Sequence, residues 1–159
     1  MPQNPDTPVT LTPVDSEREA EWVRRLLARS GLPTEDLSLD GGPEPAGGNP
    51  TLYTVEADGD RVGCVGLERD GDAGLLRSAA VAEPHRGRGY GGAAVRALEA
   101  RARAAGVGTL YLLTTTAAEF FAGLGYERVN RESVPESIRE SAEFSDLCPS
   151  SATVMRRRL

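Results

Sequence analysis

The stretch HRGRGYGG, residues 85–92, places two arginines, a histidine and four glycines in consecutive positions. Glycine lets a ligand approach the backbone without a Cβ in the way. Arginine donates charge-assisted hydrogen bonds to anions. The composition of this stretch therefore predicts a turn that binds phosphate groups.

Two phosphate-binding patterns overlap in this turn. Gly87, Gly89 and Gly92 match the dinucleotide pattern G-x-G-x-x-G, whereas Arg86, Gly89 and Gly91 match R-x-x-G-x-G, the pattern of an acyl-CoA pyrophosphate loop. A dinucleotide fold needs the turn after its first strand and an acidic residue about 20 positions later. Here the turn lies past mid-chain after predicted hairpins, and the next strand ends in threonines. The surroundings favour the acyl-CoA pattern.

The elements around the turn fit an anion site. A predicted strand ends at Val81, and a helix with alanine, valine and leucine on one face runs from Tyr90 to Gly106. The first N–H groups of such a helix are free, and its dipole favours a negative charge there. Arg86 and Arg88 would add hydrogen bonds to the same anion.

Apolar periodicity and turn residues predict the remaining elements. Ser16 and Glu19 form a capping box for a helix that ends at Gly31. Two Asp-Gly turns, within 58–60 and 70–72, predict antiparallel hairpins. Strands are predicted at 9–14, 51–57, 61–69, 73–81, 108–116, 126–129 and 151–159, and further helices at 117–125 and 133–147.

Length and composition narrow the class of protein. The chain of 159 residues fits a disordered lead-in, 1–8, and one domain, 9–159. A net charge of −6 disfavours nucleic acid, and no apolar run is long enough for a membrane span. The N-terminus does not resemble a signal peptide. Cys64, Cys148 and a single histidine do not form a metal or disulfide framework, so we expect a cytoplasmic protein without metal. All 18 basic residues are arginine, which either high genomic GC content or salt adaptation would explain.

The segment AVAEPHRGRGYGGAAVRALEARARAAG, residues 80–106, resembles the central motif of the GNAT superfamily of acetyl-CoA-dependent N-acetyltransferases. The predicted order of elements is also similar to that superfamily. The resemblance implies an α/β (α+β) fold with a mixed, mostly antiparallel central sheet of about seven strands. Helices would cover both faces of this sheet, and strands four and five would splay apart.

The resemblance also implies how acetyl-CoA would bind. Backbone amides between Arg86 and Gly91 would hold the pyrophosphate. The Val81 backbone would pair with the pantetheine arm, which adds to the sheet as a strand does. The residues expected to bind the cofactor are Ala79, Val81, Arg86, Gly87, Arg88, Gly89, Tyr90 and Gly91.

Three segments, LLRSAAV (75–81), YLLTTTAAEFFAGLGY (111–126) and FSDLCPSSA (144–152), resemble a narrower subgroup. Its members are often labelled arsenic-resistance N-acetyltransferases and are similar to the acetyltransferase domain of N-acetylglutamate synthases. The label defines no substrate, and two cysteines do not suit arsenite chelation.

The catalytic groups depart from the family pattern. Phe121 stands where many members have the tyrosine that protonates the departing thiolate. Thr115 or water would donate this proton instead, or the reaction needs no acid. Leu75 stands where some members have a glutamate. Glu68 is the first candidate for the base, directly or through water; the alternative is a solvated hairpin carboxylate.

The acceptor side has its own candidates. Arg77 lies four residues before Val81, which predicts that both share a face of the sheet. A guanidinium there would suit a carboxylate; the alternative is an arginine paired with a neighbouring acid. Thr114 and Thr116 would add a polar rim.

Together these features predict an enzyme that transfers acetyl from acetyl-CoA to a small, carboxylate-bearing, amino-acid-like amine. The alternatives are a protein or peptide N-acetyltransferase and a non-catalytic acyl-CoA-binding module. We expect no nucleic-acid or membrane partner, and a homodimer is possible.

Overall fold

The computed structural model describes residues 9–30, 51–87, 89–114, 117–135 and 153–159. The expected lead-in (1–8), Arg88, Thr115, Thr116 and nearly all of the expected helix at 133–147 lie outside these ranges. Within the described ranges, no helix is both long and apolar enough to cross a membrane.

The described residues form one sheet of seven strands in the order β1-β2-β3-β4-β5-β7-β6. Neighbouring strands run antiparallel except β4 and β5, which are parallel. This arrangement confirms the predicted mixed, mostly antiparallel sheet. The strands are β1 (Thr10–Pro13), β2 (Thr51–Ala57), β3 (Asp60–Asp70), β4 (Ala73–Val81), β5 (Thr109–Thr114), β6 (Glu127–Arg128) and β7 (Thr153–Arg158).

Helix α1 (Glu17–Arg29) covers one face of the sheet. The capping box is confirmed, because the Ser16 side chain accepts a hydrogen bond from the Glu19 N–H at 3.2 Å. Its apolar stripe, including Val23 and Leu27, packs against residues of β2 and β3 such as Leu52. We call this side of the sheet the α1 face.

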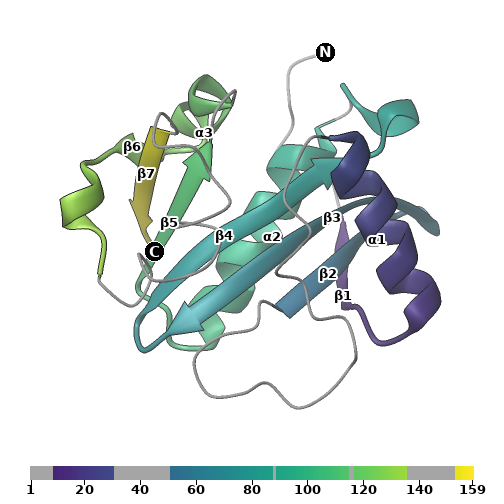
Figure 1. The fold of residues 1–159 in the computed structure, drawn as a ribbon, viewed down its shortest axis with the longest axis horizontal. Helices are drawn as coiled ribbons and strands as arrows, with labels where there is room; N and C mark the ends of the chain where they lie inside the picture. The colour runs from purple at the N-terminus through teal and green to yellow at the C-terminus, as the bar shows by residue number, and fades with distance from the viewer. Residues whose placement is uncertain (1–8, 31–50, 88, 115–116, 136–152) are drawn as a thin grey trace.

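Helix α2 (Tyr90–Ala104) covers the opposite side, which we call the α2 face, and Figure 1 shows it behind β2–β4. Val95 and Leu98 of this helix belong to the largest core cluster, together with Val65 and Leu76 from the strands. The short helix α3 (Ala118–Gly123) follows β5. Two 3-10 turns, η1 (Glu83–His85) and η2 (Arg131–Ser133), complete the described elements.

The strands β4 and β5 pair only at their beginnings. The parallel ladder joins Ala73–Leu75 to Thr109–Tyr111, and the two strands then diverge (Figure 1). Ser78 and Ala79 of β4 lie opposite the single residue Val65 of β3, which is a β-bulge. Ser78 has a positive φ of 56°, uncommon for a residue with a side chain. The bulge lies in the part of β4 that has left β5.

This bulge changes which face each β4 side chain occupies. Arg77 pairs with Gly66 and Val81 with Gly63, three positions apart along β3. Side chains alternate between faces along a strand, so these two lie on opposite faces. The prediction that Arg77 and Val81 share a face is wrong, because the extra residue shifts the alternation between them.

Candidate functional site

The glycine-rich turn forms a helix start with outward backbone donors. Gly89 is the N-cap of α2, with φ 85° and ψ 5°. The Ala93 N–H donates to the Gly89 carbonyl at 3.1 Å, which is the first hydrogen bond of the helix. The N–H groups of Tyr90 and Gly91 come before it and have no acceptor within the helix. The dipole of α2 adds positive potential at this point.

The end of β4 presents an edge next to this helix start. The Ala82 N–H donates to the Val62 carbonyl at 2.8 Å, so the polar groups of Ala82 point toward β3. Backbone groups alternate between the two edges of a strand, so those of Val81 point the other way, toward the side that β5 has left. The Arg86 Nε donates to the Val81 carbonyl at 2.9 Å and joins the turn to the strand end.

Phe120 of α3 completes this region. A Cβ added to Gly91 would lie 3.5 Å from the Phe120 Cζ and 3.7 Å from a Val81 methyl carbon. Phe120 is only partly buried. Three elements therefore meet here: the end of β4, the first turn of α2, and α3. The contact is between residues distant in sequence, so no local signal could have found it.

The other predicted cofactor-binding residues lie around the same point. Ala79 is half-buried in the diverging part of β4. Tyr90 is half-buried, with its ring edge-on to His85 at a centroid distance of 6.2 Å. Arg86 and Gly87 are exposed. The structure thus brings the described members of the predicted set together.

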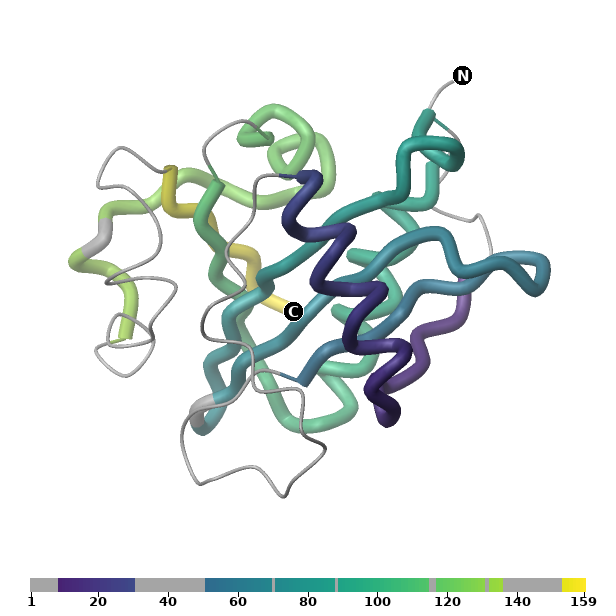
Figure 2. The backbone as a smooth tube through the Cα atoms, turned by 45° about the vertical axis from the view of Figure 1, so that its right-hand side comes forward, coloured from purple at the N-terminus to yellow at the C-terminus, as the bar shows by residue number. Residues whose placement is uncertain are grey.

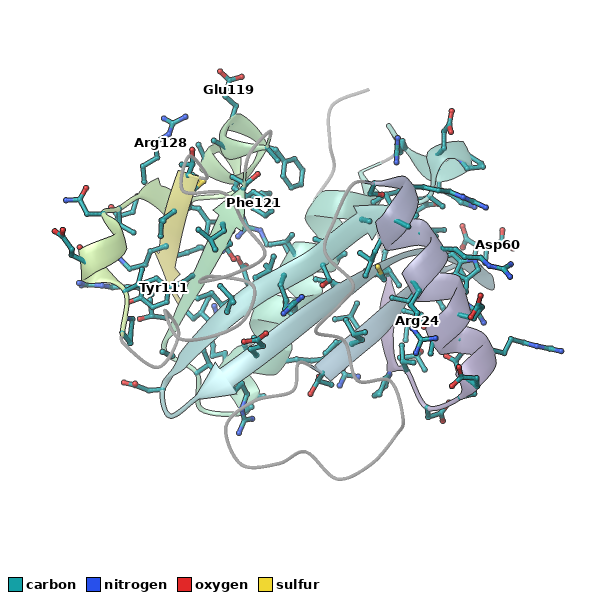
Figure 3. The ribbon with its side chains drawn as sticks, in the orientation of Figure 1. Arg24, Asp60, Tyr111, Glu119, Phe121 and Arg128 are labelled. Atoms are coloured by element: carbon teal, nitrogen blue, oxygen red, sulfur yellow. The ribbon has the colours of Figure 1, made fainter. Side chains whose placement is uncertain are left out.

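Phe121 is buried on the sheet-facing side of α3, while Glu119 on the same helix points away (Figure 3). Its ring packs edge-on against Phe120 and Tyr126, at centroid distances of 5.0 and 5.6 Å. Phenylalanine has no proton to donate, so this position supplies packing rather than an acid.

Glu68, the candidate base, and Arg77, the candidate for the acceptor carboxylate, contact each other, so Arg77 is paired with a neighbouring acid as its alternative interpretation predicted. The Arg77 Nη1 lies 2.6 Å from the Glu68 Oε1, and the exposed fractions of the two side chains are 0% and 11%. The Arg77 Nε also donates to the Ser78 Oγ at 3.2 Å. Gly66 makes room for this arginine, because a Cβ there would lie 2.9 Å from a Leu52 methyl carbon and 3.4 Å from the Arg77 Cγ. The pair lies on the α1 face.

The threonines of β5 are only partly described. The Thr114 Oγ1 accepts a hydrogen bond from the Ala117 N–H at 2.9 Å, in the turn before α3. Thr115 and Thr116 fall outside the described residues, as does Cys148. Among the residues that the structure describes, no group of three or more histidine, cysteine, aspartate or glutamate side chains could hold a metal ion.

Cys64 is a buried thiol on β3 that donates to the Ser78 carbonyl at 3.3 Å. Burial raises its pKa to about 12. We therefore expect iodoacetamide at pH 8 to leave Cys64 unmodified in the folded protein and to modify it in urea, as measured by peptide mass spectrometry. Modification of the native protein at the rate of the unfolded chain would contradict this burial.

The same thiol should affect stability at alkaline pH. An unfolded cysteine ionises near about pH 8.5. Because the pKa of Cys64 is higher in the folded protein, the protonated thiol contributes its full share to the free energy of unfolding below the pKa of the unfolded cysteine. This contribution is lost as the pH rises toward the folded value of about 12.

A diverging strand edge suits the pantetheine arm of an acyl-CoA, and a glycine-rich helix start beside it suits the pyrophosphate. Together these two features are typical of an acyl-CoA-binding domain. Residues 17–126 match the model of the acetyltransferase (GNAT) family. This match spans more than half of the chain, and the protein belongs to that family. The resemblance inferred from residues 80–106 is thereby confirmed.

Relatives and solved structures agree with this assignment. The chain is 40% identical over 83 residues to an amino-acid acetyltransferase of Azotobacter vinelandii, covering 51% of this chain and 19% of the relative. The corresponding protein of Pseudomonas fluorescens is 39% identical over 83 residues, with the same coverage. The chain thus spans about a fifth of the length of these relatives.

The fold is similar to that of N-acetylglutamate synthase from Neisseria gonorrhoeae, solved with coenzyme A and N-acetyl-glutamate. The TM-score is 0.72 at 21% identity, covering 97% of this chain and 36% of that one. Rv2747 from Mycobacterium tuberculosis, solved with CoA, has a TM-score of 0.67 at 24% identity, covering 96% and 99% of the two chains. These likenesses confirm the GNAT fold. The arsenic-resistance label, the cytoplasmic location and the homodimer stay predictions.

Proposed function

We propose that this GNAT acetyltransferase domain transfers the acetyl group of acetyl-CoA to the amine of a small, carboxylate-bearing, amino-acid-like acceptor. One observation carries the proposal. A strand edge and a helix start that suit CoA converge at Val81 and Gly91, while a buried ion pair between Arg77 of β4 and Glu68 of β3 lies on the other face of the sheet. The matched relatives named amino-acid acetyltransferases support this acceptor class.

On the donor side, the backbone N–H groups at the start of α2 would hold the CoA pyrophosphate. The edge of β4 at Val81, on the side that β5 has left, would pair with the pantetheine arm as an added strand. Arg86 is fixed to the Val81 carbonyl through Nε, which leaves its two Nη groups to contact phosphate oxygens. The thioester would then lie between the diverging strands β4 and β5.

On the acceptor side, the amine would approach from the α1 face. Arg77 is fully buried and paired with Glu68, so the acceptor carboxylate would bind the guanidinium beside this ion pair after the side chains that cover it move. Glu68, which is 11% exposed, would accept a proton from the acceptor ammonium, directly or through water. The amine nitrogen forms a bond to the thioester carbonyl carbon, and the carbon–sulfur bond breaks. The newly acylated nitrogen loses its second proton, and this proton passes through Thr115 or water to the departing thiolate, because Phe121 has none to give.

The test measures CoA thiol release from acetyl-CoA over a panel of α-amino acids, the matching amines without the α-carboxylate, and short peptides. We expect turnover with one or more amino acids and poor turnover with the decarboxylated amines. Turnover restricted to peptides would instead support a protein N-acetyltransferase. CoA binding without turnover on any acceptor would support a non-catalytic acyl-CoA-binding module.

An Arg77→Lys variant in the same assay tests the acceptor assignment. Lysine keeps the charge but cannot make a planar two-point contact. Loss of a charge-assisted hydrogen bond should reduce kcat/KM for the amino acid by about 30- to 150-fold, with KM for acetyl-CoA unchanged. Equal losses on acceptors with and without a carboxylate would mean that Arg77 does not bind the carboxylate.

A further inference from the structure

A buried carboxylate outside the proposed reaction centre joins α2 to the end of the chain. Glu99 of α2 is 3% exposed. Its Oε1 lies 2.6 Å from the Arg157 Nη1 on β7 and 3.0 Å from the Arg96 Nη1 on α2. Its other oxygen, Oε2, accepts a hydrogen bond from the Tyr126 hydroxyl at 2.9 Å. The proposed reaction uses none of these four groups.

Tyr126 connects Glu99 to a row of three aromatic rings, those of Tyr126, Phe121 and Phe120. Burial, followed by the negative charge of Glu99, raises the pKa of the Tyr126 hydroxyl, which therefore remains a donor at neutral pH. The Tyr126 ring packs edge-on against Phe121, and Phe121 packs edge-on against Phe120. The stack thus runs from the anchored tyrosine back along α3 to its first turn.

The stack ends at the proposed CoA loop. The Phe120 ring tip is the nearest group to the position that a Cβ on Gly91 would occupy, and a Val81 methyl group lies beside it. Gly91 and Glu99 are eight residues apart on α2, or about 12 Å along the helix axis. The segment from α3 to Tyr126 therefore contacts α2 at two points, the helix start and a site two turns later. Figure 2 shows the start of α2 and α3 at the same end of the sheet.

We propose that Tyr126 and Glu99 are positioning residues that hold Phe120 against Gly91 and thereby set the affinity of the loop for CoA. The inference rests on the proposed function only in that this loop binds CoA. The hydrogen bond from Tyr126 to Glu99 fixes the tilt of the tyrosine ring, which supports Phe121. Phe121 in turn limits the rotation of Phe120, so the backbone donors of the loop keep one arrangement before CoA binds.

The test measures Kd for CoA by isothermal titration calorimetry in a double-mutant cycle. Phe120→Ala removes the last ring of the stack and should weaken CoA binding about tenfold. Tyr126→Phe removes only the hydroxyl and should weaken it about fivefold, as expected for a residue that acts through others. The double variant should resemble Phe120→Ala alone, because coupled residues are not additive.

Two further variants separate positioning from general stability. Tyr53→Phe removes the hydroxyl of another buried tyrosine, whose ring lies under the Arg101 guanidinium at 4.9 Å, and should leave Kd unchanged. Glu99→Gln keeps an oxygen that accepts from Tyr126, so its Kd should lie nearer to wild type than that of Tyr126→Phe.

The inference is overturned if Tyr126→Phe binds CoA as wild type does, whatever its melting temperature. It is also overturned if the two losses multiply in the double variant, or if Tyr53→Phe weakens binding equally. A wild-type protein that does not bind CoA would contradict the proposed function instead, so the two failures are distinguishable.

Discussion

Replacing Gly89 with valine should abolish the stabilisation of this protein by acetyl-CoA. A ligand at 100 times its Kd stabilises the native state by about 2.7 kcal/mol, which raises Tm by about 5–10 °C in a domain of this size. Gly89 has a φ of 85° at the N-cap of α2. A β-branched residue is strained there, and its Cβ would stand where a phosphate approaches the backbone. Differential scanning fluorimetry with and without acetyl-CoA measures the shift.

The matched control is Gly71→Val. Gly71 also has a positive φ, 61°, and open space around it, but it lies in the turn between β3 and β4. This variant should lower Tm through backbone strain and still show the full acetyl-CoA shift. NADH should shift neither wild type nor control. If acetyl-CoA raises the Tm of Gly89→Val as much as that of wild type, the loop is not part of the CoA site. If NADH raises the Tm strongly, the turn binds a dinucleotide instead.

Replacing Glu68 with alanine should cost on the order of 3–5 kcal/mol of unfolding free energy. The Arg77 side chain is 0% exposed and lies 2.6 Å from Glu68, so the variant would remove this carboxylate from beside a buried guanidinium. That loss corresponds to a decrease in Tm of about 10 °C. Urea unfolding of the wild type and the variant measures it.

An exposed ion pair provides the comparison. Arg25 and Glu21 on α1 lie 3.3 Å apart with exposed side-chain fractions of 68% and 50%. Water screens such a pair, so Glu21→Ala should change stability by less than about 1 kcal/mol. A Glu68→Leu and Arg77→Met double variant should recover much of the loss of Glu68→Ala, since it removes both charges. If Glu68→Ala lowers the free energy of unfolding no more than Glu21→Ala does, the Arg77–Glu68 pair does not stabilise the fold as predicted.

The sequence by itself determined the features that depend on neighbouring residues. The capping box of Ser16 and Glu19, the two Asp-Gly hairpin turns and the glycine-rich helix start are local patterns, and the structure contains each of them. These patterns were sufficient to predict most of the helices and strands in their order along the chain, and residues 80–106 carried the resemblance to the family. Local hydrogen bonds and backbone preferences decide these features, so they can be inferred without a partner segment.

Tertiary structure alone decided how distant residues face each other. The bulge at Ser78 and Ala79 shifts the alternation along β4, and no residue pattern in the strand announces it. It places Arg77 on the face opposite Val81 and beside Glu68 from the neighbouring strand. Likewise, the fold brings the Phe120 ring of α3 next to Gly91 at the start of α2. Register and packing between segments far apart in the chain depend on which surfaces meet, and a single sequence does not encode that in any local signal.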